Sequence, residues 1–193
     1  MGNRGATDAR ELPIPAHGAA RWSPSKGELL NEAMKLLASQ PNAIFIGQGV
    51  ASDGIATFAD FDGIPMEQRI EFPIAEELNV GYATGLAMMG YLPIVCIPRM
   101  DFLLRAADQI INHLEKIEEM SRGQWSPKII IRTRVGSRRP LDPGPQHSQD
   151  HSAAFRRMLT NVNVWDIRDV DNIVPTYAHA LHSKRSVIFV EAF

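Results

Sequence analysis

Two adjacent glutamates, Glu76 and Glu77, open an apolar stretch in the middle of the chain, EFPIAEELNVGYATGLAMMG (residues 71–90). The small and apolar residues that follow predict a buried helix from about residue 75 to 89. Acidic side chains at a helix start can simply favour the positive end of the helix dipole, which is worth about 0.3–1 kcal/mol. A carboxylate screened from water can instead share a proton with a weakly basic ligand. The pattern alone leaves both roles open, and helix stabilisation is the commoner one.

Two further positions carry side chains suited to a binding site. His147 lies in the run PQHSQ, within a predicted loop, and imidazole titrates near neutral pH. Phe102 begins a predicted helix, where its aromatic ring can pack with Ala106 and Ile110 on one apolar face. A solvated surface position is the simpler interpretation for four other histidines, His113, His151, His179 and His182.

Four arginines gather in the stretch RTRVGSRR, residues 132–139, where the chain leaves a predicted strand. Guanidinium groups recognise carboxylates and phosphates through paired hydrogen bonds. We therefore hypothesise that Arg134, Arg138 or Arg139 binds an anionic substrate, such as a sugar phosphate or a dicarboxylic oxoacid. A solvated charged surface explains the run equally well.

The elements that must position these residues alternate along the chain. Apolar periodicity predicts helices at about 23–39, 75–89, 102–120, 153–159 and 172–181, and strands at 42–47, 92–97, 128–132, 162–166 and 187–191. This alternation predicts an α/β fold: a single doubly wound domain with a mostly parallel sheet and helices on both faces. Residues 48–70 show no clear period, and we interpret them as a long functional loop or lid.

Length and composition set further limits. The 193 residues predict one domain, residues 23–193, after a flexible arm of residues 1–22. The net charge of -2 gives no reason to expect nucleic acid or a membrane as partner, and no apolar run is long enough to span a bilayer. The single cysteine, Cys96, excludes an internal disulfide framework and suits a reducing compartment, so we expect a cytoplasmic protein.

Common nucleotide and metal motifs are missing from the sequence. Gly47-Gln48-Gly49 begins like a dinucleotide fingerprint, but Ser52 stands where the third glycine is needed. The sequence contains no GxxxxGK[ST] phosphate loop, no HExxH zinc motif and no GxSxG hydrolase elbow. The sequence therefore rules out a phosphate loop of the NTPase type, and no motif in it suggests a transition-metal site or a hydrolase.

Three segments in a fixed order resemble one family. FPIAEELNVGYATGLAMMGYLPIV, MDFLLRAADQIINHLEKIEEMSRGQ and GPQHSQDHSAAF are similar to the pyrimidine-binding domain of thiamine-diphosphate enzymes. The resemblance covers about residues 25–193. It is strongest to the N-terminal domain of the β subunit of pyruvate and branched-chain 2-oxoacid dehydrogenases, and weaker to transketolase and deoxyxylulose phosphate synthase.

The resemblance implies a role for four residues. Glu76 matches the glutamate that hydrogen-bonds a ring nitrogen of the aminopyrimidine and activates the cofactor. Phe102 matches an aromatic residue that packs on the same ring. His147 matches a histidine that faces the reaction centre, where it helps bind the substrate or handle protons. Gln48 departs from the family pattern, which has an acidic pair here, and is at best a substitute for a cofactor-binding carboxylate.

The resemblance also implies a partner chain. The family's GDG motif for the metal and the diphosphate has no counterpart in the sequence, and the family's usual C-terminal domain is missing from it. We therefore expect thiamine diphosphate and Mg²⁺ to be held mainly by a diphosphate-binding, α-type subunit, in a heterotetramer. The expected interface includes Met88, Met89, Met100, Phe102 and Trp125.

Three functions are compatible with the sequence. The first is the pyrimidine-binding subunit of a split thiamine-diphosphate enzyme that acts on a 2-oxoacid or ketose by decarboxylation, carboligation or two-carbon ketol transfer. The missing docking domain argues against membership in a large lipoyl-dependent complex. The second is a non-catalytic assembly or regulatory relative of the same fold, and the third is an unrelated α/β binding domain. Glu76 and His147 favour the first function over the second.

Overall fold

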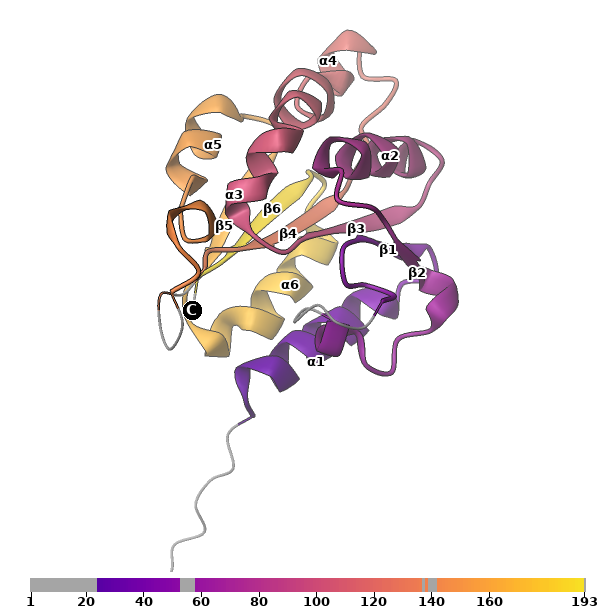
Figure 1. Ribbon diagram of the computed structural model, residues 1–193. Coiled ribbons are helices and arrows are strands. Elements are labelled where there is room, and N and C mark those ends of the chain that lie inside the picture. The colour runs from indigo at the N-terminus through magenta and orange to yellow at the C-terminus, as the bar shows by residue number, and fades with distance from the viewer. Residues whose placement is uncertain (1–23, 53–57, 137, 139–141, 193) are drawn as a thin grey trace, which may run out of the picture.

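The protein is described by a computed structural model that covers residues 24–52, 58–136, 138 and 142–192. The arm expected at residues 1–22 lies outside the described residues. Within them, six strands form one sheet in the order β2-β1-β3-β4-β6-β5, and all five pairings are parallel (Figure 1). The strands are β1 Ala43–Gly47, β2 Arg69–Glu71, β3 Leu92–Ile97, β4 Ile130–Arg134, β5 Asn163–Ile167 and β6 Val187–Glu191.

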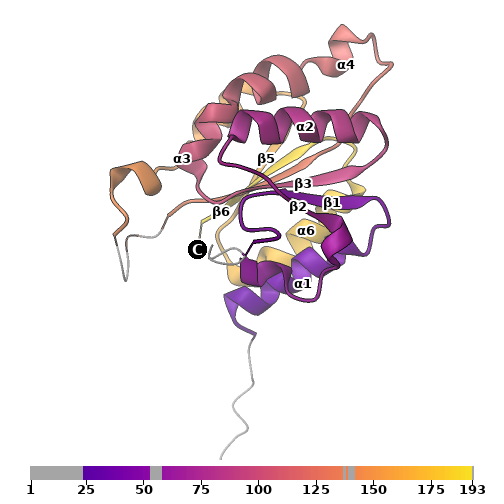
Figure 2. The same ribbon diagram turned by 45° about the vertical axis from the view of Figure 1, so that its right-hand side comes forward.

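Helices cover both faces of the sheet (Figures 1 and 2). On one face lie α1, Lys26–Ala38, and α6, Ile173–His182. On the other lie α2 Glu76–Met88, α3 Met100–Leu103, α4 Ile117–Met120 and α5 Ser152–Met158. Each face has its own apolar core among the described residues, one around α1 and α6 and one around α2 and α3. The prediction of a doubly wound α/β domain is confirmed.

The helix predicted at residues 102–120 is wrong as a single element. After α3 the chain continues through a 3₁₀ turn, η3 Leu104–Ala106, and a π-helical segment, η4 Gln109–Leu114, before α4. The buried side chains still recur every three or four residues, at Leu103, Ala106, Ile110 and Leu114. Because the 3₁₀ and π segments are each only about one turn long, the apolar spacing of three or four residues does not reveal the change in backbone hydrogen bonding.

The segment predicted as a lid, residues 48–70, is mostly packed on the domain where the structure describes it. It contains two 3₁₀ turns, η1 Phe58–Phe61 and η2 Met66–Gln68, and the start of β2. Phe61 is fully buried in the core beside α1. The Asn31 side chain donates hydrogen bonds to the carbonyl groups of Asp60 and Asp62, at 3.0 and 2.8 Å. These contacts fix the segment to α1.

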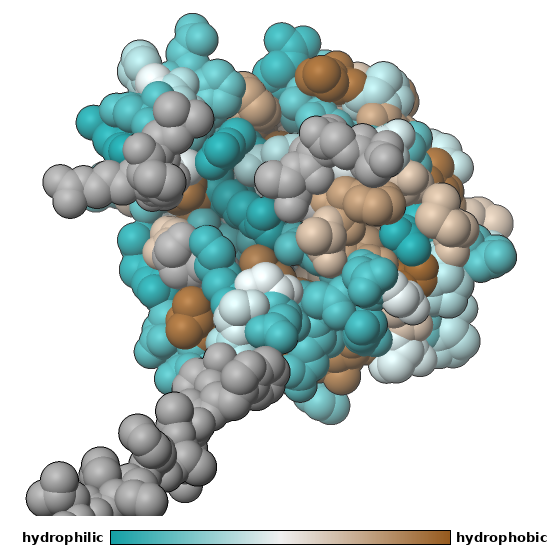
Figure 3. Space-filling view, turned by 60° about the horizontal axis from the view of Figure 1, so that its bottom comes forward, coloured by the Kyte–Doolittle hydropathy of each residue, from teal (hydrophilic) through white to brown (hydrophobic). Residues whose placement is uncertain are grey.

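One face of the molecule carries a hollow with hydrophilic side chains around it, and hydrophobic side chains gather mainly to its right (Figure 3). Among the described residues, no helix is both long enough and apolar enough to cross a membrane.

Met100, predicted at a subunit interface, is fully buried in the core beside α3, so that prediction is wrong. Its side chain follows the apolar periodicity of the segment, and that periodicity faces the sheet.

Candidate active site

Glu76 is the first residue of α2, and only 1% of its surface is exposed. The N-cap residue of this helix, Ala75, makes no side-chain capping hydrogen bond. Glu76 Oε1 accepts a hydrogen bond from Gln48 Nε2 at 3.3 Å. Its Oε2 is buried, and no described residue donates a hydrogen bond to it. The carboxylate therefore keeps one unsatisfied acceptor, which is rare for a buried group.

Glu77 takes no part in this arrangement, because its side chain is exposed. The contrast separates the two glutamates: Glu77 has the ordinary position of an acidic residue at a helix start, whereas Glu76 has been removed from water.

Gln48 reaches Glu76 because the chain turns sharply where β1 ends. Gly47 has φ +132° and Gly49 has φ +68°, which both lie in the region that favours glycine. A Cβ atom at Gly47 would lie 2.2 Å from the carbonyl oxygen of Cys96 on β3. Two glycines thus let the chain bend around Gln48, which is 6% exposed, and the bend directs its amide toward Glu76.

Phe102 and His147 contact each other from different elements. The Phe102 ring on α3 lies 5.3 Å from the His147 ring, centroid to centroid, in an edge-on arrangement at 85°. His147 ends the 3₁₀ turn η5, Pro145–His147, and its Nδ1 is buried without a hydrogen-bond partner among the described residues. Gly136 allows this approach, since a Cβ atom there would lie 1.8 Å from the His147 carbonyl oxygen.

Arg105 is a site residue that the sequence analysis missed. It lies on η3, one turn after Phe102, and its Nε is 3.7 Å from the free Oε2 of Glu76. The Arg105 side chain is 74% exposed, so it stands between the buried carboxylate and water. One set of contacts therefore joins Gln48, Glu76 and Arg105, and the Phe102–His147 pair begins one helical turn before Arg105. The only sequence signal was the spacing of three residues between Phe102 and Arg105, which places both on one helical face.

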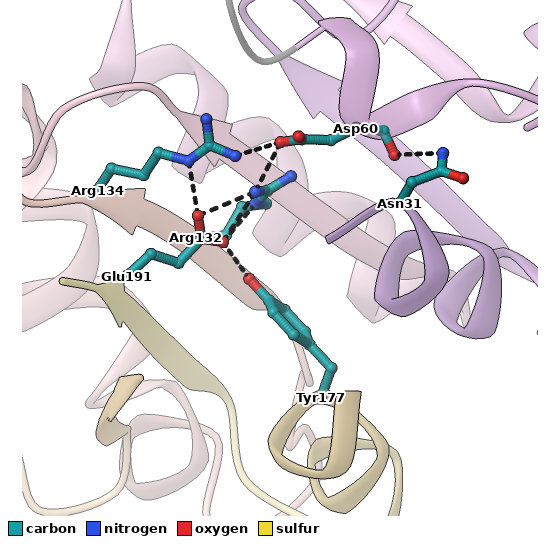
Figure 4. Close-up of polar contacts among 6 residues, drawn as sticks. All are labelled: Asn31, Asp60, Arg132, Arg134, Tyr177 and Glu191. Atoms are coloured by element: carbon teal, nitrogen blue, oxygen red, sulfur yellow. Dashed lines mark hydrogen bonds and ion pairs between the residues drawn. The ribbon is translucent and has the colours of Figure 1, made fainter. Parts of the chain in front are cut away.

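Much of the arginine run is used inside the protein. Arg132 is 3% exposed, and its Nε and Nη2 donate to the Glu191 carboxylate at 2.9 and 3.0 Å (Figure 4). Arg134 donates from Nε to Glu191 at 2.7 Å and from Nη2 to Asp60. Tyr177 donates its hydroxyl to Glu191 at 2.6 Å. These five side chains, on β4, β6, η1 and α6, are buried except for Arg134, which is partly exposed, and we call them the ion cluster.

Electrostatics of the ion cluster favour its charged form. Burial would raise the pKa of Glu191, but the charges of Arg132 and Arg134 and the Tyr177 hydroxyl outweigh burial and hold that pKa below its usual value. Burial and the nearby Glu191 charge raise the pKa of Tyr177 well above its usual value. Burial also raises the pKa of the Cys96 thiol, to about 12.

The other two arginines of the hypothesis differ. Arg138 is exposed and donates from Nε to Ser148 Oγ at 3.4 Å, next to His147 in sequence. Arg139 lies outside the described residues. The structure thus links Arg138 to the loop of His147, whereas Arg134 pairs with two carboxylates, Glu191 and Asp60.

Among the described side chains, no group of three or more histidine, cysteine, aspartate or glutamate residues is arranged to hold a metal ion.

A comparison with protein families identifies the family of this chain. The family described as "Transketolase, pyrimidine binding domain" matches residues 23–192. The chain belongs to this family. The resemblance seen in the sequence is therefore confirmed, and the buried glutamate, the aromatic ring and the histidine lie in a transketolase-type pyrimidine-binding domain.

Curated relatives of this pyrimidine-binding domain are subunits of oxoacid dehydrogenases. It is 30% identical to the 2-oxoisovalerate dehydrogenase subunit beta of Bacillus subtilis, over 66% of this chain and 40% of the relative. It is 31% identical to the mitochondrial pyruvate dehydrogenase E1 component subunit beta-2 of Oryza sativa subsp. japonica, over 79% of this chain and 41% of the relative. The chain thus spans well under half of the length of these relatives.

Solved structures share the fold of the pyrimidine-binding domain. A split gene transketolase, described as an inactive beta4 tetramer, matches with a TM-score of 0.63 and 20% identity over 86% of this chain and 51% of that chain. The transketolase of Campylobacter jejuni matches with a TM-score of 0.62 and 20% identity, over 86% of this chain and 24% of that one. At this identity the likeness supports the fold alone.

Proposed function

We propose that this chain is the pyrimidine-binding subunit of a split thiamine-diphosphate enzyme, and that it works on a 2-oxoacid or a ketose with a partner chain. The observation that carries the proposal is the buried carboxylate of Glu76, with Oε1 held by Gln48 and Oε2 left without a donor. Membership in the pyrimidine-binding family and the similarity to β subunits of two oxoacid dehydrogenases support the same function.

The residues around Glu76 fit an aminopyrimidine ring. Oε2 would accept a hydrogen bond from a ring N–H, which supplies the partner that this buried oxygen lacks. Phe102, which is only partly buried, would cover a flat heterocycle and exclude water from the contact. Gln48 would hold the carboxylate in its orientation from the other side. Bound thiamine diphosphate supplies a nucleophilic carbon for attack on a substrate carbonyl group.

His147 and Arg138 would contact the substrate. His147 presents a buried Nδ1 without a partner among the described residues, and this atom can donate or accept a proton at a bound substrate. Arg138 reaches Ser148 and would bind an anionic group of the substrate. Arg134 is the weaker candidate, because Glu191 and Asp60 already neutralise its charge. Arg139 stays a candidate from the sequence.

A partner chain would supply the diphosphate and Mg²⁺ side of the site. The exposed face of α2 and the residues beside it carry an apolar stripe with helical spacing, which begins two residues before Glu76: Ile74, Leu78, Tyr82 and Met89, 81%, 52%, 45% and 79% exposed. Apolar patches of this kind are typical of subunit interfaces. We propose that an α-type subunit covers this stripe in a heterotetramer, and that the expected interface residues Met89 and Trp125 belong to the same surface.

Calorimetric titration tests the proposal. Thiamine diphosphate with Mg²⁺ is titrated into this chain alone and into its complex with a co-purified partner. We expect binding in the complex only. We also expect at least a tenfold rise in Kd for Glu76→Gln, because this substitution replaces one of the two carboxylate oxygens with an NH₂ group. Glu77→Gln, one residue along the same helix and exposed, is the matched control. A complex that binds no cofactor would support the non-catalytic alternative.

A further inference from the structure

The Glu71 carboxylate binds four consecutive backbone N–H groups. Glu71 ends β2, and its Oε1 accepts from Gly49 at 2.7 Å, while its Oε2 accepts from the next three residues, at 3.0 Å from Val50, 2.8 Å from Ala51 and 3.0 Å from Ser52. Successive backbone N–H groups in a tight turn form a concave anion site. Here a side chain of the same chain occupies that site, 19–22 residues away in sequence.

This contact holds the turn that follows Gln48. The residue before Gln48 is fixed by the sheet, because Gly47 pairs with Cys96 on β3 and accepts a hydrogen bond from the Phe72 N–H at 2.8 Å. The residues after Gln48 are fixed by Glu71. The Gln48 side chain therefore starts from a backbone that is held on both sides, and its amide reaches the Glu76 Oε1.

We propose that Glu71 is a positioning residue for the cofactor site. Through the turn of residues 49–52 it holds Gln48, and Gln48 occupies Oε1 of Glu76, so that Oε2 is the oxygen left for the ligand. The proposal rests on the proposed function, because the ligand is the aminopyrimidine. Both oxygens of Glu71 are engaged by the backbone, so Glu71 acts through Gln48 and has no direct contact with the cofactor.

The chemistry of the turn requires a carboxylate. Four N–H donors need two acceptor oxygens, and an ionised carboxylate offers acceptor positions on both. A glutamine at the same place has one acceptor oxygen and turns an NH₂ group toward at least one backbone N–H. That N–H then loses its partner, and the turn opens. Glu71→Gln therefore keeps nearly the same side-chain shape and removes one of the acceptor oxygens that hold the turn of residues 49–52.

A double-mutant cycle in the complex tests the coupling. Thiamine diphosphate with Mg²⁺ is titrated by calorimetry into the complex with wild-type chain, Glu71→Gln, Gln48→Ala and the double variant. We expect each single variant to raise Kd about tenfold, the scale of one lost charged hydrogen bond in a buried site, and the double variant to be no worse than Gln48→Ala. Glu67→Gln, exposed and four residues earlier, is the matched control and leaves Kd unchanged.

Hydrogen exchange of the cofactor-free chain gives a second, independent measurement. The amides of residues 49–52 exchange at least tenfold faster in Glu71→Gln than in the wild type, whereas Gln48→Ala leaves them unchanged, because the turn acts on Gln48 and not the reverse. If Glu71→Gln fails to fold, Gly49→Ala is used instead. At φ +68° an alanine strains the same turn, and its effect on Kd must also vanish in the Gln48→Ala background.

The outcomes separate this proposal from the proposed function. Losses that add in the double variant show that Glu71 acts independently of Gln48 and overturn the positioning role, as do unchanged exchange rates at residues 49–52. If the wild-type complex binds no cofactor at all, the proposed function fails first, and the positioning role fails with it.

Discussion

The strongest prediction concerns the ion cluster, and the perturbation is Glu191→Gln. Glu191 lies on β6, is 2% exposed, and accepts hydrogen bonds from Arg132, Arg134 and Tyr177. The substitution keeps the size of the side chain but removes its charge and one acceptor oxygen. It leaves the buried guanidinium of Arg132 with Asp60 as its remaining carboxylate partner.

The magnitude follows from what is left behind. Removing one partner of a buried ion pair costs about 3–5 kcal/mol, since the other charge stays buried without compensation. Asp60 still pairs with Arg132 at 2.9 Å, so we expect the lower end of this range. For a domain of this size each kcal/mol lowers Tm by about 2–4 °C, so Tm falls by about 10 °C.

Urea unfolding followed by circular dichroism measures the loss, and the pH dependence identifies its cause. The pKa of Glu191 is lowered in the folded protein, so its contribution to stability is fully present above the unfolded-state value, near 4.5, and is lost as pH falls through the folded-state pKa. The difference in unfolding free energy between wild type and Glu191→Gln must therefore shrink in acid. Glu119→Gln, at an exposed position on α4, is the control and changes stability by less than about 0.5 kcal/mol.

Two results would refute this reasoning. A loss below about 1 kcal/mol at neutral pH would show that water or rearranged side chains solvate Arg132, so that the cluster does not behave as a buried ion pair. A large loss that stays constant down to pH 3 would show that packing, and not the Glu191 charge, is responsible.

Three other predictions follow from single contacts. Gly136→Ala places a Cβ against the His147 carbonyl and displaces the His147 loop, so we expect turnover by the proposed complex to fall at least tenfold. The control Gly27→Ala, in open space on α1, leaves turnover unchanged and stabilises the chain by up to about 1 kcal/mol. Leu78→Lys puts a charge into the apolar stripe, so we expect the chain to elute without its proposed partner in size-exclusion chromatography but to keep its Tm. Co-elution with the partner would show that α2 lies outside the interface. Cys96, buried and with a pKa of about 12, reacts with a thiol reagent only after unfolding, and rapid modification of the native chain would contradict its burial.

The parts of the fold that the sequence predicted are those with long apolar runs. β3 and β6 are buried along their whole length, and a continuous apolar run of four to six residues predicts such a strand directly. β2 was missed because it has three residues, Arg69, Ile70 and Glu71, of which none is buried. An edge strand of that length carries no periodic signal, and only its pairing with β1 makes it a strand.

The candidate site was predictable only in part, for a similar reason. Glu76, Phe102 and His147 lie in local sequence patterns that resemble those of the pyrimidine-binding family. Arg105 and Glu71 act on residues far away in sequence, and nothing in their own neighbourhoods marks them. Arg105 contacts a carboxylate 29 positions before it, and Glu71 binds a turn about 20 positions before it. Such residues become visible only when the fold brings β1, β2, α2 and η3 together.

The arginine run shows how a small error in a strand boundary changes a functional inference. The predicted strand ended at Arg132, which made Arg134 a loop residue available to a substrate. The structure continues β4 to Arg134, and alternate residues of a strand share one face, so Arg132 and Arg134 both meet Glu191, which pairs with Arg134 across the sheet. The charges of Arg132 and Arg134 are therefore neutralised by ion pairs within the domain. Among the described residues of the run, Arg138 is exposed and lies beyond the strand end, so it is the arginine that we propose for an anionic substrate.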